Sequence, residues 1–157
     1  MTQPDRRSRL EEREAELVRA LRGGTPPAGL DRRMIALASA GITHKRMRQV
    51  ARAFPALTSD LGPDYRERFA AFAETNPPMD GGAIADGLAF GRAVASKRPL
   101  GKAATIERMI IRSSVTFRRG ELRPRRTPYV AFTCLTRPVT LILVVRVPRV
   151  GTRVFST

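Results

Sequence analysis

The hydrophobic pattern of this 157-residue chain changes its period once, from a helical repeat to an alternating one. Up to about residue 95, apolar side chains recur every three or four residues, as they do on one face of an α-helix. From residue 107 onward, side chains alternate in character, which is typical of extended strands. The sequence therefore predicts an α+β protein: an N-terminal helical bundle of four or five helices, followed by a small antiparallel β-sheet module.

Helix start and stop signals divide the first part of the chain. Ser8 and Glu11 have the spacing of a capping box, and Gly23 is placed to end the helix that follows. Asp31 is placed to cap a second helix. Gly41 and the β-branched residues after it weaken the middle of this second helix, so a bend is expected there.

Two further helices are predicted at residues 64–74 and 82–95. The first carries aromatic side chains on one side, and the second brings Gly87 and Gly91 to one face, where small residues permit close helix contact. The hydrophobic anchors of these helices are expected to form the core. The expected helical domain spans residues 1–98.

The expected sheet module spans residues 99–157. Alternation predicts a strand over residues 107–118, with Arg108, Arg112 and Arg118 on one face. A basic loop follows at 119–128. Further strands are predicted at 129–135, 139–147 and 152–155, and the second of these is apolar on both faces, so it is expected to be central.

The charge of the chain is strongly asymmetric. Of the 29 Lys and Arg residues, 15 lie in residues 91–157, where Glu107 and Glu121 are the only acids. The net charge of +15 therefore lies almost entirely in this back part. Such a basic surface predicts a negatively charged partner, whether a peptide, a protein or a nucleic acid.

Several function classes receive no support from the residues. Cys134 and His44 are the only cysteine and histidine, so the chain cannot by itself form a disulfide or a zinc tetrad. Cys134 is expected to be buried in a strand. The N-terminal sequence has no apolar segment of a signal peptide, and no run is long enough to span a membrane. We therefore expect a cytoplasmic protein without cofactor, resident metal or catalytic site.

A series of hydrophobic anchors and turns resembles a known family. It runs through Ala53-Phe54-Pro55-Ala56-Leu57, Leu61-Gly62, Tyr65, Phe69, Phe72, Asn76-Pro77-Pro78, Asp86-Gly87 and Phe90. This series resembles the helical domain of the accessory subunits that accompany TIM-barrel multinuclear iron oxidases in ribosomal-peptide modification, as in methanobactin biosynthesis. Stretches 45–52 and 145–151 are also similar to one branch of that family. Some members of the family carry a DNA-binding label, and some are fused to the iron enzyme.

The resemblance implies a non-catalytic accessory protein that binds an iron-dependent oxidase of TIM-barrel type, its acidic precursor peptide, or both. Any metal would then belong to the enzyme. A sheet module of this kind can bind a peptide as an added edge strand, with arginines selecting acidic side chains. The candidate residues are Arg108, Arg112, Arg118, Arg123, Arg125 and Arg126. The alternative is that these arginines only solvate the outer face of the sheet.

Two other functions remain open at this point. A nucleic-acid-binding protein would act mainly through phosphate contacts, because the sequence contains no helix-turn-helix, zinc finger or RNA-binding aromatic pair. The basic residues of one helix would contribute, namely Lys45, Arg46, Arg48 and Arg52. The other hypothesis is a generic protein-interaction domain.

Overall fold

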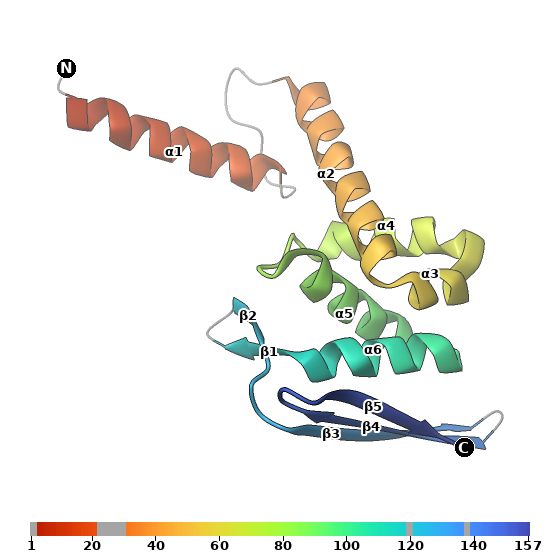
Figure 1. The fold of residues 1–157 in the computed structure, drawn as a ribbon. Coiled ribbons are helices and arrows are strands. Elements are labelled where there is room, and N and C mark those ends of the chain that lie inside the picture. The colour runs from red at the N-terminus through yellow and green to blue at the C-terminus, as the bar shows by residue number, and fades with distance from the viewer. Residues whose placement is uncertain (1–2, 22–30, 119–120, 137–138) are drawn as a thin grey trace. The chain divides into compact units, whose positions relative to one another are not determined.

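A computed structural model describes residues 3–21, 31–118, 121–136 and 139–157. Its helices precede its strands, so the predicted α+β class is confirmed (Figure 1). The helices are α1 (Gln3–Leu21), α2 (Arg32–Ala53), α3 (Pro55–Leu61), α4 (Tyr65–Thr75), α5 (Gly82–Ala95) and α6 (Lys102–Ser114), with a 3-10 turn η1 (Gly62–Asp64) before α4. The strands are β1 (Val115–Arg118), β2 (Glu121–Pro124), β3 (Tyr129–Thr136), β4 (Val139–Val147) and β5 (Gly151–Ser156).

The chain forms two compact units, Met1–Lys45 and Arg46–Thr157. The second unit contains α3 to α6 and all five strands. It therefore includes residues on both sides of the boundary expected between residues 98 and 99, and that boundary stays a prediction.

The helix ends predicted for the first part of the chain are only partly confirmed. Ser8 lies inside α1, so the capping box predicted there is wrong. Gly23 lies outside the described residues. Asp31 caps α2 as predicted, because its Oδ1 accepts a hydrogen bond of 2.8 Å from the N–H of Arg33. The bend expected at Gly41 is absent, since α2 is one continuous helix.

Aromatic rings form the core of the second unit. Phe54, Phe69 and Phe90 are at most 1% exposed. The rings of Phe69 and Phe90 pack nearly edge to face, with their centroids 5.1 Å apart. The hydroxyl of Tyr65 donates a 2.7 Å hydrogen bond to the carbonyl of Met47, and burial raises the pKa of Tyr65 to about 12. The hydrophobic anchors predicted from the sequence are therefore core residues.

Gly87 and Gly91 of α5 permit close packing, as predicted. A Cβ atom at Gly87 would overlap the ring of Phe54. A Cβ atom at Gly91 would lie 2.7 Å from Cδ of Arg108 on α6. Gly91 therefore lets the aliphatic part of the Arg108 side chain cross α5.

A buried ion pair joins α2 to α5. Arg46 donates from Nε to Asp86 Oδ2 at 2.8 Å and from a terminal nitrogen to Asp86 Oδ1 at 3.0 Å. The same side chain also donates to the carbonyl of Asn76 at 3.0 Å. Arg46 is only 7% exposed, so its predicted role on a nucleic-acid-binding surface is wrong.

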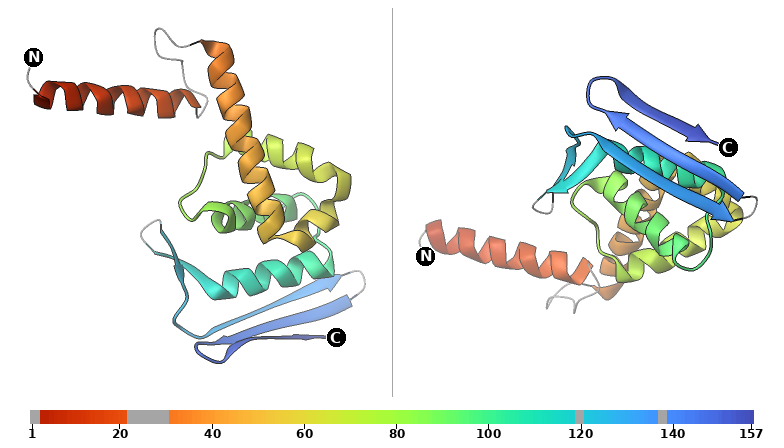
Figure 2. Two further views of the ribbon diagram at one scale, coloured as in Figure 1. Left: turned by 45° about the horizontal axis from the view of Figure 1, so that its top comes forward. Right: turned by 90° about the horizontal axis from the view of Figure 1, so that it is seen from below.

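The strands form two antiparallel sheets. β1 pairs with β2 in a hairpin, and β3, β4 and β5 form a three-stranded sheet with β4 in the centre, as predicted. Helix α6 lies lengthwise against one face of the larger sheet, between that sheet and the other helices of the unit (Figures 1 and 2). Ile142 and Val144 of β4 are buried under α6, at 1% and 0% exposure.

The strand predicted at residues 107–118 is wrong over most of its length. Residues 102–114 form α6, and only β1 is extended. The helix is favoured because this segment packs on two sides: α6 contacts α3 on one side and the three-stranded sheet on another. The predicted loop at 119–128 likewise contains strand β2.

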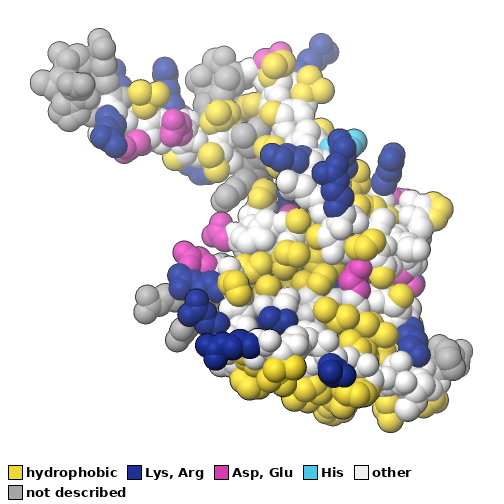
Figure 3. All heavy atoms as spheres, in the orientation of Figure 1, with side chains coloured by type: hydrophobic (Ala, Val, Ile, Leu, Met, Phe, Trp, Pro, Cys, Tyr) yellow, Lys and Arg dark blue, Asp and Glu magenta, His cyan; other side chains and the backbone are white. Residues whose placement is uncertain are grey.

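The face of the sheet that points away from α6 is apolar and exposed. Odd-numbered residues of β4 lie beside even-numbered residues of β3, so that Phe132, Leu143 and Phe155 form one row across the three strands. We call this the outer sheet face; its large apolar residues are Val130, Phe132, Val139, Leu141, Leu143, Val147 and Phe155, all exposed. Cys134 is also exposed on it, contrary to prediction. Figure 3 shows hydrophobic side chains gathered over this sheet.

Among the described helices, none has the length and apolar character needed to cross a lipid bilayer.

Asp86→Ala is predicted to destabilise the protein by about 3–5 kcal/mol, because it leaves the charge of Arg46 buried without its carboxylate partner. The control is Asp64→Ala, which removes an exposed ion pair with Arg68 and should cost less than about 1 kcal/mol. Urea unfolding followed by circular dichroism measures both. Equal losses for the two variants would contradict the structural role of the buried pair.

Candidate binding groove

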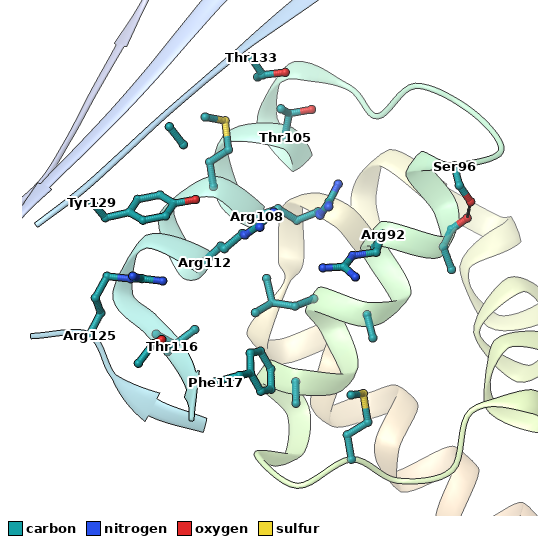
Figure 4. Close-up of a pocket in the computed structure, with 18 of the residues that line it drawn as sticks. Arg92, Ser96, Thr105, Arg108, Arg112, Thr116, Phe117, Arg125, Tyr129 and Thr133 are labelled. Atoms are coloured by element: carbon teal, nitrogen blue, oxygen red, sulfur yellow. Dashed lines mark hydrogen bonds between the residues drawn. The ribbon is translucent and has the colours of Figure 1, made fainter. Parts of the chain in front are cut away.

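An open groove of about 930 Å³ lies between α5, α6, β1 and β3 (Figure 4). Four arginines line it: Arg92 from α5, Arg108 and Arg112 from α6, and Arg125 from the segment after β2. We call it the arginine groove. Its walls also include apolar side chains such as Leu88, Met109 and Phe117, and the hydroxyl groups of Ser96, Thr105 and Thr133.

Helical spacing explains why these side chains converge. On α6, Thr105, Arg108 and Arg112 are three and four residues apart and share one face. Leu88 and Arg92 of α5, with Ser96 at the C-cap of that helix, are four residues apart and face the groove from the other side. In Figure 4, Arg92, Arg108 and Arg112 extend from the two helices toward a common space.

The fourth arginine is fixed by the end of α6 and by β3. The N–H of Arg125 donates a 2.8 Å hydrogen bond to the carbonyl of Ser114, the last residue of α6. The guanidinium group of Arg125 lies over the ring of Tyr129, with its central carbon 4.7 Å from the ring centroid. The stacking holds this charge at the end of the groove where β3 begins.

The groove is strongly positive because its arginines have no carboxylate near them. None of the described residues that line it is acidic. The Nε atoms of Arg108 and Arg125 are buried and find no hydrogen-bond acceptor among the described residues. Burial lowers the pKa of Arg108, and the charges of Arg112 and Arg92 lower it further. A buried donor without an acceptor is costly, so the groove is suited to bind an anion.

Strand β3 forms the sheet side of the groove. Tyr129, Ala131 and Thr133 line the groove from alternate positions of the strand. In the described part of the chain, β3 pairs only with β4, so its other edge carries backbone groups that no strand satisfies. The arginine groove therefore lies beside a free strand edge.

Of the five predicted peptide-binding arginines whose side chains the structure describes, three line the groove. These are Arg108, Arg112 and Arg125, although the first two lie on a helix and not on a strand. Arg123 is exposed and pairs with Glu121 at 2.6 Å, and Arg126 is exposed outside the groove lining. The side chain of Arg118 lies outside the described residues.

Three of the four residues predicted on a basic helix surface are exposed. Lys45, Arg48 and Arg52 are exposed on α2, whereas Arg46 is buried. The described residues contain no group of three or more His, Cys, Asp or Glu side chains arranged to hold a metal ion.

Sequence reasoning missed two residues of the groove, Arg92 and Tyr129. Arg92 repeats at four-residue spacing with Leu88 and Ser96, which indicates a helix face with one charged member. Tyr129 is four positions after Arg125 in the sequence. An arginine this near to an aromatic residue only weakly indicates that its guanidinium group stacks on the ring.

Arg108→Met is predicted to raise the free energy of unfolding by less than about 1 kcal/mol in dilute buffer. The variant removes a partly desolvated charge that Arg92 and Arg112 repel, and solvent screens part of that repulsion. The control is Arg98→Met. It removes hydrogen bonds of 3.0 Å to the carbonyl and carboxylate of Asp60 and should cost about 1–3 kcal/mol. Urea unfolding distinguishes the two; a loss in Arg108→Met as large as in Arg98→Met would mean that Arg108 has a structural partner.

Comparison with known proteins places the helical part of the chain in a family. A protein of Streptomyces avermitilis described as a UPF0276 protein is 38% identical to it over 85 residues. The matched stretch is 54% of this chain but only 17% of that protein, so the relative is much longer than the stretch it shares. No solved structure matches the chain.

The family model described as SCO6045-like, C-terminal domain matches residues 11–96. These residues include α2 to α5, whose hydrophobic anchors form the core. Because the match spans more than half of the sequence, the chain belongs to the SCO6045-like C-terminal domain family.

Proposed function

We propose that this protein is a non-catalytic accessory protein that binds an acidic precursor peptide in the arginine groove and holds it for a multinuclear iron enzyme of TIM-barrel type. The observation that carries the proposal is the arginine groove itself. Within the part of the chain that the structure describes, four arginines and no acidic residue line it, and it lies beside a free strand edge. Its size suits a ligand larger than a single small anion.

The free edge of β3 supports a peptide as the ligand. An extended peptide can add to such an edge as a further strand, because its backbone satisfies the unpaired N–H and C=O groups. Main-chain hydrogen bonds alone do not select a sequence. The arginines supply that selection, since guanidinium groups bind carboxylates through paired, charge-assisted hydrogen bonds.

The outer sheet face supports the second part of the proposal, the docking of an enzyme. Phe132 is 83% exposed, Val139 is 76% exposed and Leu141 is 56% exposed. A contiguous apolar surface of this kind is typical of a protein–protein contact. The longer relative from S. avermitilis agrees with such a partner, because the shared stretch occurs there within a larger protein. The iron would belong to the enzyme, as the family resemblance implies.

A nucleic-acid-binding function is the second candidate. It is supported by the net charge of +15 and by Lys45, Arg48 and Arg52, which are exposed on α2. The burial of Arg46 and the pairing of Arg123 with Glu121 reduce the basic residues available for phosphate. A generic protein-interaction domain would use the outer sheet face without the arginine groove.

Replacing Arg108 and Arg125 together by Gln is predicted to weaken binding of an acidic peptide by about tenfold or more, since each loses charge-assisted hydrogen bonds. The control is Arg66→Gln with Arg153→Gln, which removes the same charge from exposed positions outside the groove lining and should change the affinity by less than about twofold. Fluorescence anisotropy with a labelled peptide measures both.

Equal losses in the two double variants would mean that net charge, and not the groove, attracts the peptide. Titration with random duplex DNA over a salt series provides the comparison with the second candidate. A steep fall of log affinity with log salt, unaffected by the groove variant, would favour phosphate binding through the rest of the surface.

Leu141→Gln with Phe155→Gln is predicted to abolish copurification with a coexpressed multinuclear iron enzyme of TIM-barrel type, because the enzyme would dock on the outer sheet face. The unaltered pair should stay together through about 300 mM salt, since apolar contacts resist screening. Met34→Gln with Leu37→Gln, which changes two equally exposed apolar residues on α2, serves as the control. Clean separation of the unaltered proteins would contradict the accessory role.

A further inference from the structure

We infer that the arginine groove selects peptides whose carboxylates stand at alternate positions, two residues apart, and not peptides that are merely acidic. This inference rests on the proposed function, because it requires that a peptide adds to β3. It names the feature of the peptide that the groove recognises. The contributing residues are Arg108 and Arg112 on α6, with Arg125 at the end of the groove where β3 begins.

The first support is the alternation of β3. Tyr129, Ala131 and Thr133 line the groove from alternate positions of β3, while Val130 and Phe132 belong to the outer sheet face, and Phe132 also borders the groove. A strand added at the edge of β3 continues the same pleat, so every second side chain of the peptide would point to the groove side. Adjacent acidic residues would place only one of their two carboxylates there.

The second support is a match of spacing. Arg108 and Arg112 are four residues apart on α6, which corresponds to a rise of about 6 Å along the helix axis. Alternate residues of a β-strand are about 6.6–6.8 Å apart. Because α6 lies lengthwise along the sheet, as Figure 1 shows, two carboxylates on one face of an added strand would meet two successive arginines.

The third support is that, among the described residues, the groove lacks carboxylates that could pair with its arginines. Nε of Arg108 and Nε of Arg125 are buried without an acceptor among the described residues, and the groove lining contains no carboxylate. A carboxylate that reached the half-buried guanidinium groups of Arg108 and Arg125 would accept from their terminal nitrogens and offset the mutual repulsion of Arg92, Arg108 and Arg112. Thr105 and Thr133 contribute hydroxyl groups to the lining of the same groove.

The test uses labelled peptides of identical composition and net charge, in which three Glu residues alternate with Thr and Val, stand consecutively, or recur at every third position. The full-length protein is expected to bind the alternating peptide about tenfold more tightly than either isomer, since only that isomer pairs with both arginines of α6. In Arg108→Gln with Arg112→Gln this preference should disappear, whereas in Arg66→Gln with Arg153→Gln it should remain.

Two further outcomes separate the inference from the function on which it rests. Equal binding of all three isomers, lost in the groove variant, would overturn the spacing inference and leave peptide binding in the groove intact. No measurable binding of any isomer would overturn the proposed function and the inference with it. Arg108→Lys with Arg112→Lys serves as a check on folding: it keeps the charge but lacks the forked guanidinium, so the preference should fall while general binding persists.

Discussion

The two hydrogen bonds of the Glu107 carboxylate determine how the second unit is arranged. Its oxygens accept from the N–H groups of Ala56 and Leu57 at 2.8 and 2.9 Å, at the first turn of α3. Phe54, the residue before α3, provides no side-chain cap. A carboxylate from α6 therefore satisfies donors that α3 leaves unpaired, and its negative charge suits the positive end of that helix. This contact fixes α6 against the helices, and the sheet then packs on α6.

The few acidic residues of the back part are all engaged elsewhere, which explains why the arginine groove stays positive. Residues 91–157 contain only Glu107 and Glu121. Glu107 caps α3, and Glu121 pairs with Arg123 on the exposed hairpin. Arginines with a structural function do have carboxylates: Arg46 has Asp86 and Arg98 has Asp60. Arg108, by contrast, has no carboxylate partner among the described residues, which is why we propose it as a binding residue.

The sequence predicted elements with a single strong signal and failed where two periods fit equally well. Helix α5 begins and ends at the predicted residues, and β4 has the predicted bounds and the predicted central place. Around α6, Ile110 and Ile111 are both apolar, so alternation and helical repetition describe the segment about equally. The contacts of Glu107 with α3 and of α6 with the sheet decide in favour of the helix, and neither is visible locally. The groove was predictable only in part. Arg108, Arg112 and Arg125 were identified from the sequence, but their convergence with Arg92 depends on tertiary packing that local sequence does not show.

Strand β3 contributes to both candidate surfaces, and its geometry links them. Tyr129, Ala131 and Thr133 line the arginine groove, and Val130 and Phe132 lie on the outer sheet face. The free edge of β3 lies between the two surfaces, and Phe132 borders both. A peptide added to that edge would place alternate side chains in the groove and the remaining ones level with Val130 and Phe132. The peptide would thereby become the new edge of the surface on which an enzyme docks. An enzyme that contacts this edge would then bind the loaded protein more tightly than the empty one, and by thermodynamic linkage it would strengthen peptide binding by the same factor.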